Sequence, residues 1–169
     1  MRRVRVLFCM TLLATLTNPP YGQAQGLSGI AKNFVGMWQL VSWVDAKGQF
    51  IPTRGAHPTG FIVYDASGNM SVQIMADLQL RRKYTAAQPT PDEAKAALMG
   101  YTAYFGTWEV GEKAGTIIHH RKGDLNPGGT GVDYVRKYEF GPVNRVTLIL
   151  PGPTPASFEG QRLTWERVK

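Results

Sequence analysis

The chain has 169 residues, of which 19 are basic and 12 are acidic, so its formal net charge is +7 at pH 7. That length suits one domain with a sizeable core and is short for two domains of the usual size. The basic residues are scattered, and a solvated loop explains their only run, residues 81–83. The charge pattern therefore argues against a nucleic-acid partner.

Residues 1–24 have the pattern of a signal peptide. Three arginines precede the apolar stretch at residues 6–16, and residues 22–24 supply small side chains before a cleavage position. The apolar stretch is too short for a membrane span, which needs about 20 apolar residues, and no later segment reaches that length. We therefore expect an exported protein, periplasmic or secreted, whose mature chain begins at Gln25 and forms one domain without a transmembrane segment.

Loss of this leader would change both the charge and the thiol content. Removing its three arginines leaves 16 basic against 12 acidic residues, a net charge of +4. Cys9, the only cysteine, lies in the apolar part of the leader. The mature chain is therefore expected to contain no disulfide, no nucleophilic thiol and no thiolate metal ligand.

Short segments rich in β-branched and aromatic residues alternate with turn residues along the rest of the chain. This pattern is typical of an antiparallel barrel or sandwich. The turn at Ser67-Gly68 indicates a tight hairpin, because glycine can take a positive φ there. No connection requires a parallel crossover, so we predict an all-β, single antiparallel eight-stranded barrel. The expected strands are residues 37–45, 59–66, 69–76, 105–110, 116–122, 132–140, 145–150 and 161–167.

One short helix is predicted at about residues 90–104. Thr90 is a suitable N-cap, Pro91 suits the first helical position, and Glu93 completes a capping box with Thr90. The apolar positions at helical spacing are Ala94, Ala97, Leu98 and Tyr101. We expect this face to lie across a barrel mouth or flank. Tyr101 and Tyr104 could then cap the cavity, or serve as core residues with their hydroxyls in solvent.

Trp38 and Arg167 are predicted to meet where the barrel closes. In a closed eight-stranded barrel the first and last strands are neighbours. Trp38 lies near the start of the first strand and Arg167 at the end of the last one. The guanidinium can therefore pack on the indole face, forming a structural clasp with no catalytic role.

Four stretches of the chain resemble a known protein family. They are residues 36–42 (GMWQLVS), 60–75 (GFIVYDASGNMSVQIM), 100–110 (GYTAYFGTWEV) and 115–140. In these stretches the chain resembles the lipocalin-like domain family, small bacterial and fungal proteins related in architecture to lipocalins. The resemblance implies a calycin-type barrel with a ligand cavity, without naming the ligand. Members commonly carry a longer polar-aromatic loop after residues 119–120, whereas this chain has a glycine-rich one, so contacts from that loop are not carried over.

His119 and His120 are neighbours on a predicted strand, so their side chains should point to opposite faces and cannot hold the same metal ion. If Val110 lies opposite Thr116, Glu109 shares a face with His119. Glu109 could then fix the tautomer of His119 and raise its basicity, making it a general acid or base. The alternative is a structural histidine satisfied by a hydrogen bond.

Tyr134, Arg136 and Tyr138 share one face of their predicted strand. If that face lines the barrel, Arg136 is a buried cation and needs an anionic partner, either Glu109 or a ligand carboxylate. If the face points outward, the stem of Arg136 covers apolar surface. The pattern alone leaves both arrangements open.

The sequence lacks the signatures of several enzyme classes, including the zincin, phosphate-loop, serine-elbow and dinucleotide-binding motifs. Its three histidines, with His57 in a distant loop, do not favour a metal site, although one histidine could ligate a haem. We therefore expect no metal and no cofactor.

The function that these observations favour is binding of a small, largely apolar or amphiphilic molecule, with a carboxylate as one option. The expected ligand-binding residues are Arg136, Tyr134, Tyr138, His119 and Tyr101. The alternative is a small barrel enzyme of the isomerase or cyclase type. Its candidate catalytic residues are His119, Glu109 and Tyr104.

Overall fold

The fold is described from a computed structural model, which covers residues 27, 29–80, 83–151 and 158–169. The predicted leader, residues 1–24, and the expected first mature residue, Gln25, lie outside this part of the chain.

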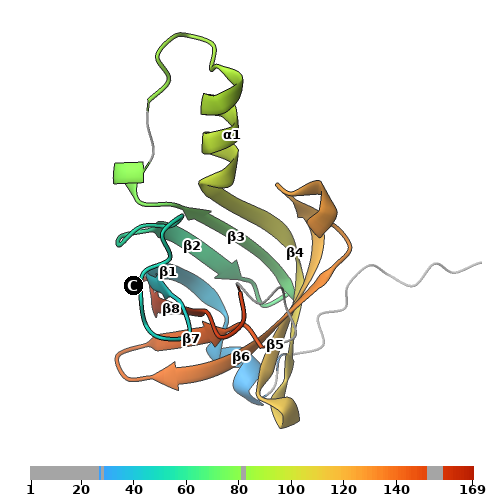
Figure 1. Cartoon of the computed structure of the whole chain (residues 1–169). Helices are drawn as coiled ribbons and strands as arrows, with labels where there is room; N and C mark the ends of the chain where they lie inside the picture. The colour runs from blue at the N-terminus through green and yellow to red at the C-terminus, as the bar shows by residue number, and fades with distance from the viewer. Residues whose placement is uncertain (1–26, 28, 81–82, 152–157) are drawn as a thin grey trace, which may run out of the picture.

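Eight strands form one closed antiparallel barrel in which each strand pairs with its neighbours in the sequence and β1 pairs with β8 (Figure 1). The predicted eight-stranded all-β barrel is therefore confirmed. The largest difference in a boundary is at β4, which begins at Tyr101 and not at residue 105. The strands are β1 (Gly36–Val44), β2 (Thr59–Tyr64), β3 (Asn69–Met75), β4 (Tyr101–Gly111), β5 (Thr116–Asp124), β6 (Asp133–Gly141), β7 (Arg145–Ile149) and β8 (Arg162–Arg167).

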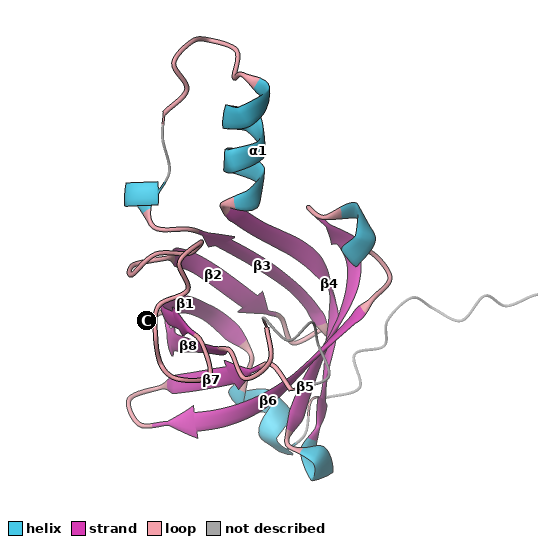
Figure 2. Cartoon of the chain, in the orientation of Figure 1, coloured by secondary structure: helices cyan, strands magenta, loops and turns pink. Residues whose placement is uncertain are grey.

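One short helical segment precedes β1, and the other helical segments lie in connections between strands (Figure 2). The α-helix α1 spans Pro91–Met99 and has the predicted capping box: Glu93 N donates to Thr90 Oγ1, and Thr90 N donates to the Glu93 carboxylate. The described residues also form short 3₁₀ helices, which are η1 (Gly29–Asn33), η2 (Leu78–Leu80), η3 (Glu112–Ala114) and η4 (Pro127–Gly129).

The predicted placement of the helix is wrong. Helix α1 ends at Met99, so Tyr101 and Tyr104 belong to β4. No residue of the helix is buried, Leu98 is 51% exposed, and the helix extends away from the barrel (Figure 1). Without Tyr101, the apolar face consists of two alanines and Leu98, which is too small to hold the helix against the barrel wall.

Phe34, which follows η1, is fully buried at one end of the barrel. Its backbone carbonyl accepts a 2.7 Å hydrogen bond from Trp38 Nε1. Its ring lies with centroid distances of 5.0 to 6.2 Å from the rings of Tyr64, Trp108, Tyr138 and Phe140. The aromatic cluster fills this end of the interior.

The predicted contact between Trp38 and Arg167 is present. The two residues are paired across β1 and β8, and Arg167 Cζ lies 4.2 Å from the centroid of the Trp38 ring. Arg167 also donates hydrogen bonds to the carbonyls of Val35 and Asn33. Gly36 has a φ of 131°, and a Cβ there would lie 2.6 Å from Arg167 Nη1. Arg167 therefore ties η1 to both closing strands, and the absence of a side chain at position 36 makes room for it.

Replacing Arg167 with alanine is expected to lower the free energy of unfolding by about 1 kcal/mol, the size of a partly desolvated contact between a cation and an aromatic ring. Urea denaturation followed by tryptophan fluorescence measures the change. Arg145→Ala is the matched control, because Arg145 on β7 makes only an exposed ion pair with Glu166. Equal stabilities of the two variants would show that the clasp contributes nothing.

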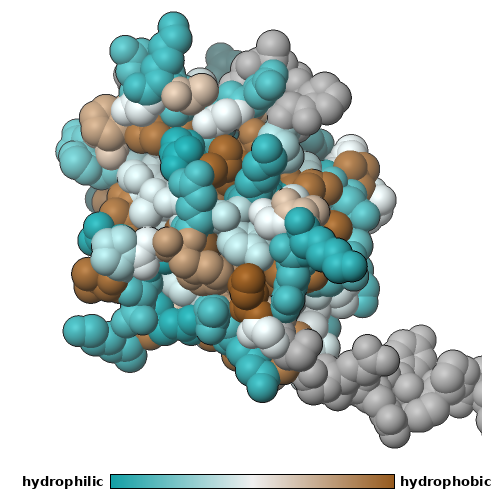
Figure 3. All heavy atoms as spheres, turned by 90° about the horizontal axis from the view of Figure 1, so that it is seen from below, coloured by the Kyte–Doolittle hydropathy of each residue, from teal (hydrophilic) through white to brown (hydrophobic). Residues whose placement is uncertain are grey.

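The outer surface mixes apolar and polar side chains, as the view from below shows (Figure 3). Exposed apolar residues that are separated by polar ones are normal on a protein surface. In the described part of the chain, no helix is both long enough and apolar enough to cross a membrane. The features that distinguish this barrel lie in its interior.

Candidate functional site

A histidine in the barrel interior is held between two tyrosines. His119 on β5 lies with Nε2 2.8 Å from the hydroxyl of Tyr64 on β2, and with Nδ1 3.0 Å from the hydroxyl of Tyr104 on β4. All three side chains are buried. The alternation of β5 places His119 inward together with Ile117 and Arg121.

The three groups are neutral at pH 7. Burial lowers the pKa of His119 well below its usual value of 6.5, and the positive charges of Arg136 and Arg121 lower it further. Burial also raises the pKa of Tyr64 well above 10 and that of Tyr104 to about 12. The trio is therefore an uncharged hydrogen-bonded chain.

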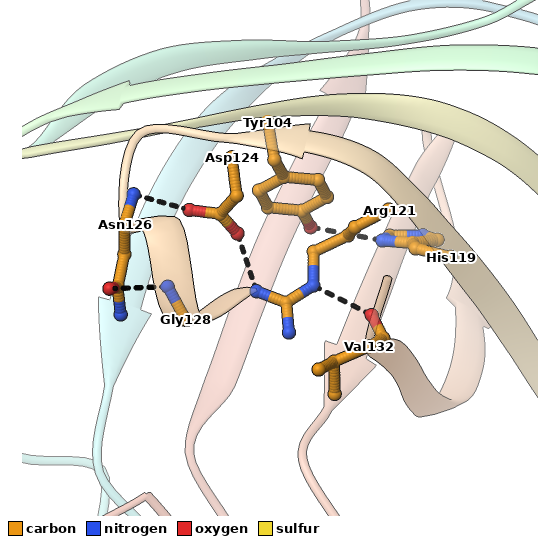
Figure 4. A network of polar contacts seen from close by, with 7 residues as sticks. All are labelled: Tyr104, His119, Arg121, Asp124, Asn126, Gly128 and Val132. Carbon is orange, nitrogen blue, oxygen red and sulfur yellow. Dashed lines mark hydrogen bonds and ion pairs between the residues drawn. The ribbon is translucent and has the colours of Figure 1, made fainter. Parts of the chain in front are cut away.

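Arg121 lies beside this trio and forms a buried ion pair with Asp124 (Figure 4). The two side chains are 3% and 8% exposed, and Arg121 Nε donates a 2.9 Å hydrogen bond to the carbonyl of Val132. The guanidinium lies over the ring of Tyr134, with Cζ 3.3 Å from its centroid. Asp124 also accepts a 2.7 Å hydrogen bond from Asn126 N, at the start of the loop that contains η4. Arg121 is thus a cation that the protein itself neutralises.

Arg136 on β6 also points into the barrel. It is 9% exposed, its Nη1 donates a 2.9 Å hydrogen bond to the carbonyl of Val135, and its Cζ lies 4.4 Å from the centroid of Tyr134. Its neighbours Val135 and Lys137 are exposed, as alternation requires. Of the residues that the structure describes, none provides a carboxylate partner for Arg136. Arg136 is therefore a buried cation without a counter-charge from the described part of the chain.

The predicted pairing of His119 with Glu109 is wrong. The β4–β5 hairpin pairs Gly111 with Thr116, not Val110 with Thr116. A shift of one residue moves every side chain to the other face of a strand. Glu109 is therefore exposed on the outer face and cannot orient His119.

Glu109 instead contacts His120 on the outside of the barrel, with 3.6 Å between His120 Nε2 and the carboxylate. His120 Nδ1 lies 2.8 Å from Asp133 Oδ1. The prediction that the two neighbouring histidines face opposite sides is confirmed, because His119 is buried and His120 is half-exposed. Glu109 is equally excluded as the partner of Arg136.

The other predicted ligand-binding residues separate into different environments. Tyr134 is half-buried between the two arginines. Tyr138 lies at the end of the barrel that the aromatic cluster around Phe34 fills, with its ring 5.2 Å from that of Phe34. Tyr101 is half-buried at the start of β4, where it pairs with Met75. Only Tyr134 stands beside Arg136 and the histidine trio.

Three residues of this interior were not predicted from the sequence: Tyr64, Arg121 and Asp124. Arg121 could have been found, because it lies two residues after His119 and therefore on the same face of the strand. Tyr64 lies two residues after Ile62 on β2 and shares its buried face. No sequence pattern, however, pairs Tyr64 with a residue on β5. Asp124 lies at the end of β5, where alternation gives no guidance.

Two buried side-chain donors of the described residues have no hydrogen-bond partner, Arg54 Nη1 and Trp165 Nε1. Within that same part of the chain, no group of three His, Cys, Asp or Glu side chains is arranged to hold a metal ion.

Comparison with known proteins identifies a family for this chain. The model of the lipocalin-like domain matches residues 35–168, which include all eight strands. A search of curated proteins found no match. Since the matched span covers most of the chain, the resemblance seen in the sequence is confirmed, and the protein belongs to the lipocalin-like domain family.

Proposed function

We propose that this protein binds a small, largely apolar molecule with an acid group, and that Arg136 receives the acid inside the barrel. A lipocalin-like barrel suggests small-molecule binding in general. The observation that supports an acid is the buried guanidinium of Arg136, which lacks a carboxylate partner in the described chain.

The physical reason is the cost of burying an unpaired charge. Moving an ion from water into a protein interior costs several kcal/mol of desolvation free energy unless an opposite charge compensates it. Asp124 is already engaged by Arg121, and the nearby tyrosines are neutral. A ligand carboxylate would supply the missing charge, and it can accept two parallel hydrogen bonds from a guanidinium.

The apolar part of such a ligand would lie against the apolar rows of the barrel wall. Val72 and Ile74 on β3, Leu148 on β7 and Leu163 on β8 are all buried and point inward. The leader pattern of residues 1–24 supports an exported binding protein, which N-terminal sequencing of extracytoplasmic material would test.

An isomerase or cyclase activity is less well supported. The chain of Tyr64, His119 and Tyr104 could move a proton, but the carboxylate expected to assist His119 lies on the outer face. Both ring nitrogens of His119 are engaged by tyrosines, so neither is free to abstract a proton from a substrate directly. Binding is therefore the function that the geometry favours.

Arg136→Met tests the proposal, because it keeps a stem of similar length and removes the charge. The wild type is expected to bind cis-parinaric acid at least about tenfold more tightly than its methyl ester, since a hydrogen bond to a charged group contributes roughly 1.5–3 kcal/mol. Arg136→Met should lose this preference and still bind the ester. Fluorescence titration measures both affinities.

Lys137→Met is the matched control. It removes a positive charge from the next position of the same strand, but on the outer face. It should keep the preference of the wild type for the acid. Equal affinities of the wild type for acid and ester would contradict the proposal.

A further inference from the structure

The trio of Tyr64, His119 and Tyr104 contains more protons than its two internal contacts can use. Neutral imidazole has one N–H donor and one acceptor nitrogen, and each tyrosine hydroxyl carries one proton. One tyrosine must donate to the acceptor nitrogen, while the oxygen of the other accepts from the ring N–H. The hydroxyl proton of that second tyrosine is then left over, and no group within the trio can accept it.

The surroundings of the two tyrosines differ in polarity. The ring of Tyr64 packs against Phe34 and Trp108, with centroid distances of 5.7 and 5.0 Å. The ring of Tyr104 makes an edge contact with Tyr134 at 5.6 Å, and Tyr134 is the ring over which both Arg136 and Arg121 lie. Arg136 acts electrostatically on both tyrosines, and more strongly on Tyr104 than on Tyr64. The rings beside Tyr64 are apolar, whereas both arginines lie over the ring beside Tyr104, so Tyr104 is the tyrosine on the cationic side of the trio.

A donor left unmet among apolar rings is costly, because it has lost its hydrogen bonds to water. Tyr64 therefore has the stronger need to donate to His119, and it faces Nε2. The ring proton must then be on Nδ1, where it is donated to the oxygen of Tyr104. The hydroxyl proton of Tyr104 remains on the side where Arg136 lies.

We propose that Tyr104 donates a second hydrogen bond to the same ligand oxygen group that Arg136 receives, and that His119 is the positioning residue that directs the Tyr104 proton toward it. The ligand part of this inference rests on the proposed function. It narrows the ligand class to molecules whose buried polar end is an oxygen acceptor, such as a carboxylate or a carbonyl. Ammonium groups, which only donate hydrogen bonds, are excluded, because they would meet donors and a positive charge.

The tautomer of His119 is the first test, and it needs no ligand. Long-range ¹H–¹⁵N correlation spectra of histidine-labelled protein at neutral pH distinguish the two neutral tautomers, and His119→Gln identifies the His119 signals by their loss. We expect the proton on Nδ1. A proton on Nε2 would overturn the inference, since Tyr64 would then hold the unused proton.

The second test compares Tyr104→Phe with Tyr64→Phe. Each variant removes one hydroxyl that is bonded to the same imidazole, so the two are matched. Tyr104→Phe should weaken binding of cis-parinaric acid by roughly tenfold or more, the value of a hydrogen bond to a charged group. It should also weaken binding of the methyl ester, whose carbonyl oxygen accepts too. Tyr64→Phe should have a clearly smaller effect on both.

Equal losses in the two variants would overturn the inference. If the wild type prefers the acid through Arg136 but Tyr104→Phe binds like the wild type, the inference fails while the proposed function stands. If acid and ester bind equally to the wild type, the proposed function fails, and the tautomer still decides how the trio is ordered. Should Tyr104→Phe not fold, the spectrum of the wild type alone decides.

Discussion

Replacing Asp124 with asparagine is expected to lower the free energy of unfolding by about 3–5 kcal/mol, because it leaves the buried charge of Arg121 without a partner. Asparagine has nearly the shape of aspartate, so the change removes the charge and little packing. Arg121 keeps its hydrogen bond to the Val132 carbonyl and its place over Tyr134, but neither supplies a negative charge. A loss of this size is a large part of the stability of a typical domain.

Urea denaturation followed by tryptophan fluorescence measures the effect of Asp124→Asn. Glu139→Gln is the matched control, because it also removes a carboxylate from an ion pair, here with Arg162. That pair is exposed, with side chains 59% and 39% accessible, and its loss should cost less than about 1 kcal/mol. If both variants unfold at the same urea concentration, the buried pair does not hold the end of β5 in place.

The free energy of unfolding is expected to fall as the pH drops below 6.5, by up to about 1.4 kcal/mol per pH unit from His119 alone. Burial keeps the pKa of His119 in the folded protein well below its usual value of 6.5. Below pH 6.5 the unfolded chain therefore binds a proton at this position that the folded protein does not. The stability that the neutral histidine contributes is complete above pH 6.5 and is lost as the pH falls.

The range between pH 6.5 and about 5 isolates this effect from that of the carboxylates. Hydrogen bonds from backbone N–H groups lower the pKa of Asp77 and Asp65 in the folded protein from a usual value of 3.8, so their contributions are lost only at lower pH. Unfolding of the wild type and of His119→Gln is compared at several pH values. The slope should be flatter in His119→Gln. An unchanged slope in His119→Gln would refute the role of the buried imidazole.

The sequence by itself determined the features that depend on local periodicity. Eight strands follow from short β-branched and aromatic segments with turns between them, and the capping box marks the start of α1. The period of two along a strand places His119 and His120 on opposite faces and groups Arg136 with Tyr134. The meeting of Trp38 and Arg167 also follows, because closure of the barrel brings the first and last strands together.

Only the tertiary structure decided which groups meet across strands. Alternation fixes the two faces of a strand but not its register, and a hairpin shifted by one residue moved Glu109 from the expected partner of His119 to the outer surface. Alternation also left open whether Arg136 faces inward, because the face of a strand that carries tyrosines can point either into the barrel or toward solvent. The contact of His119 with Tyr64 joins β5 to β2, strands that are not neighbours in the sheet, and no local pattern encodes a contact across the barrel. The site is therefore a product of barrel closure and register, while its residues were supplied by strands that the sequence already defined.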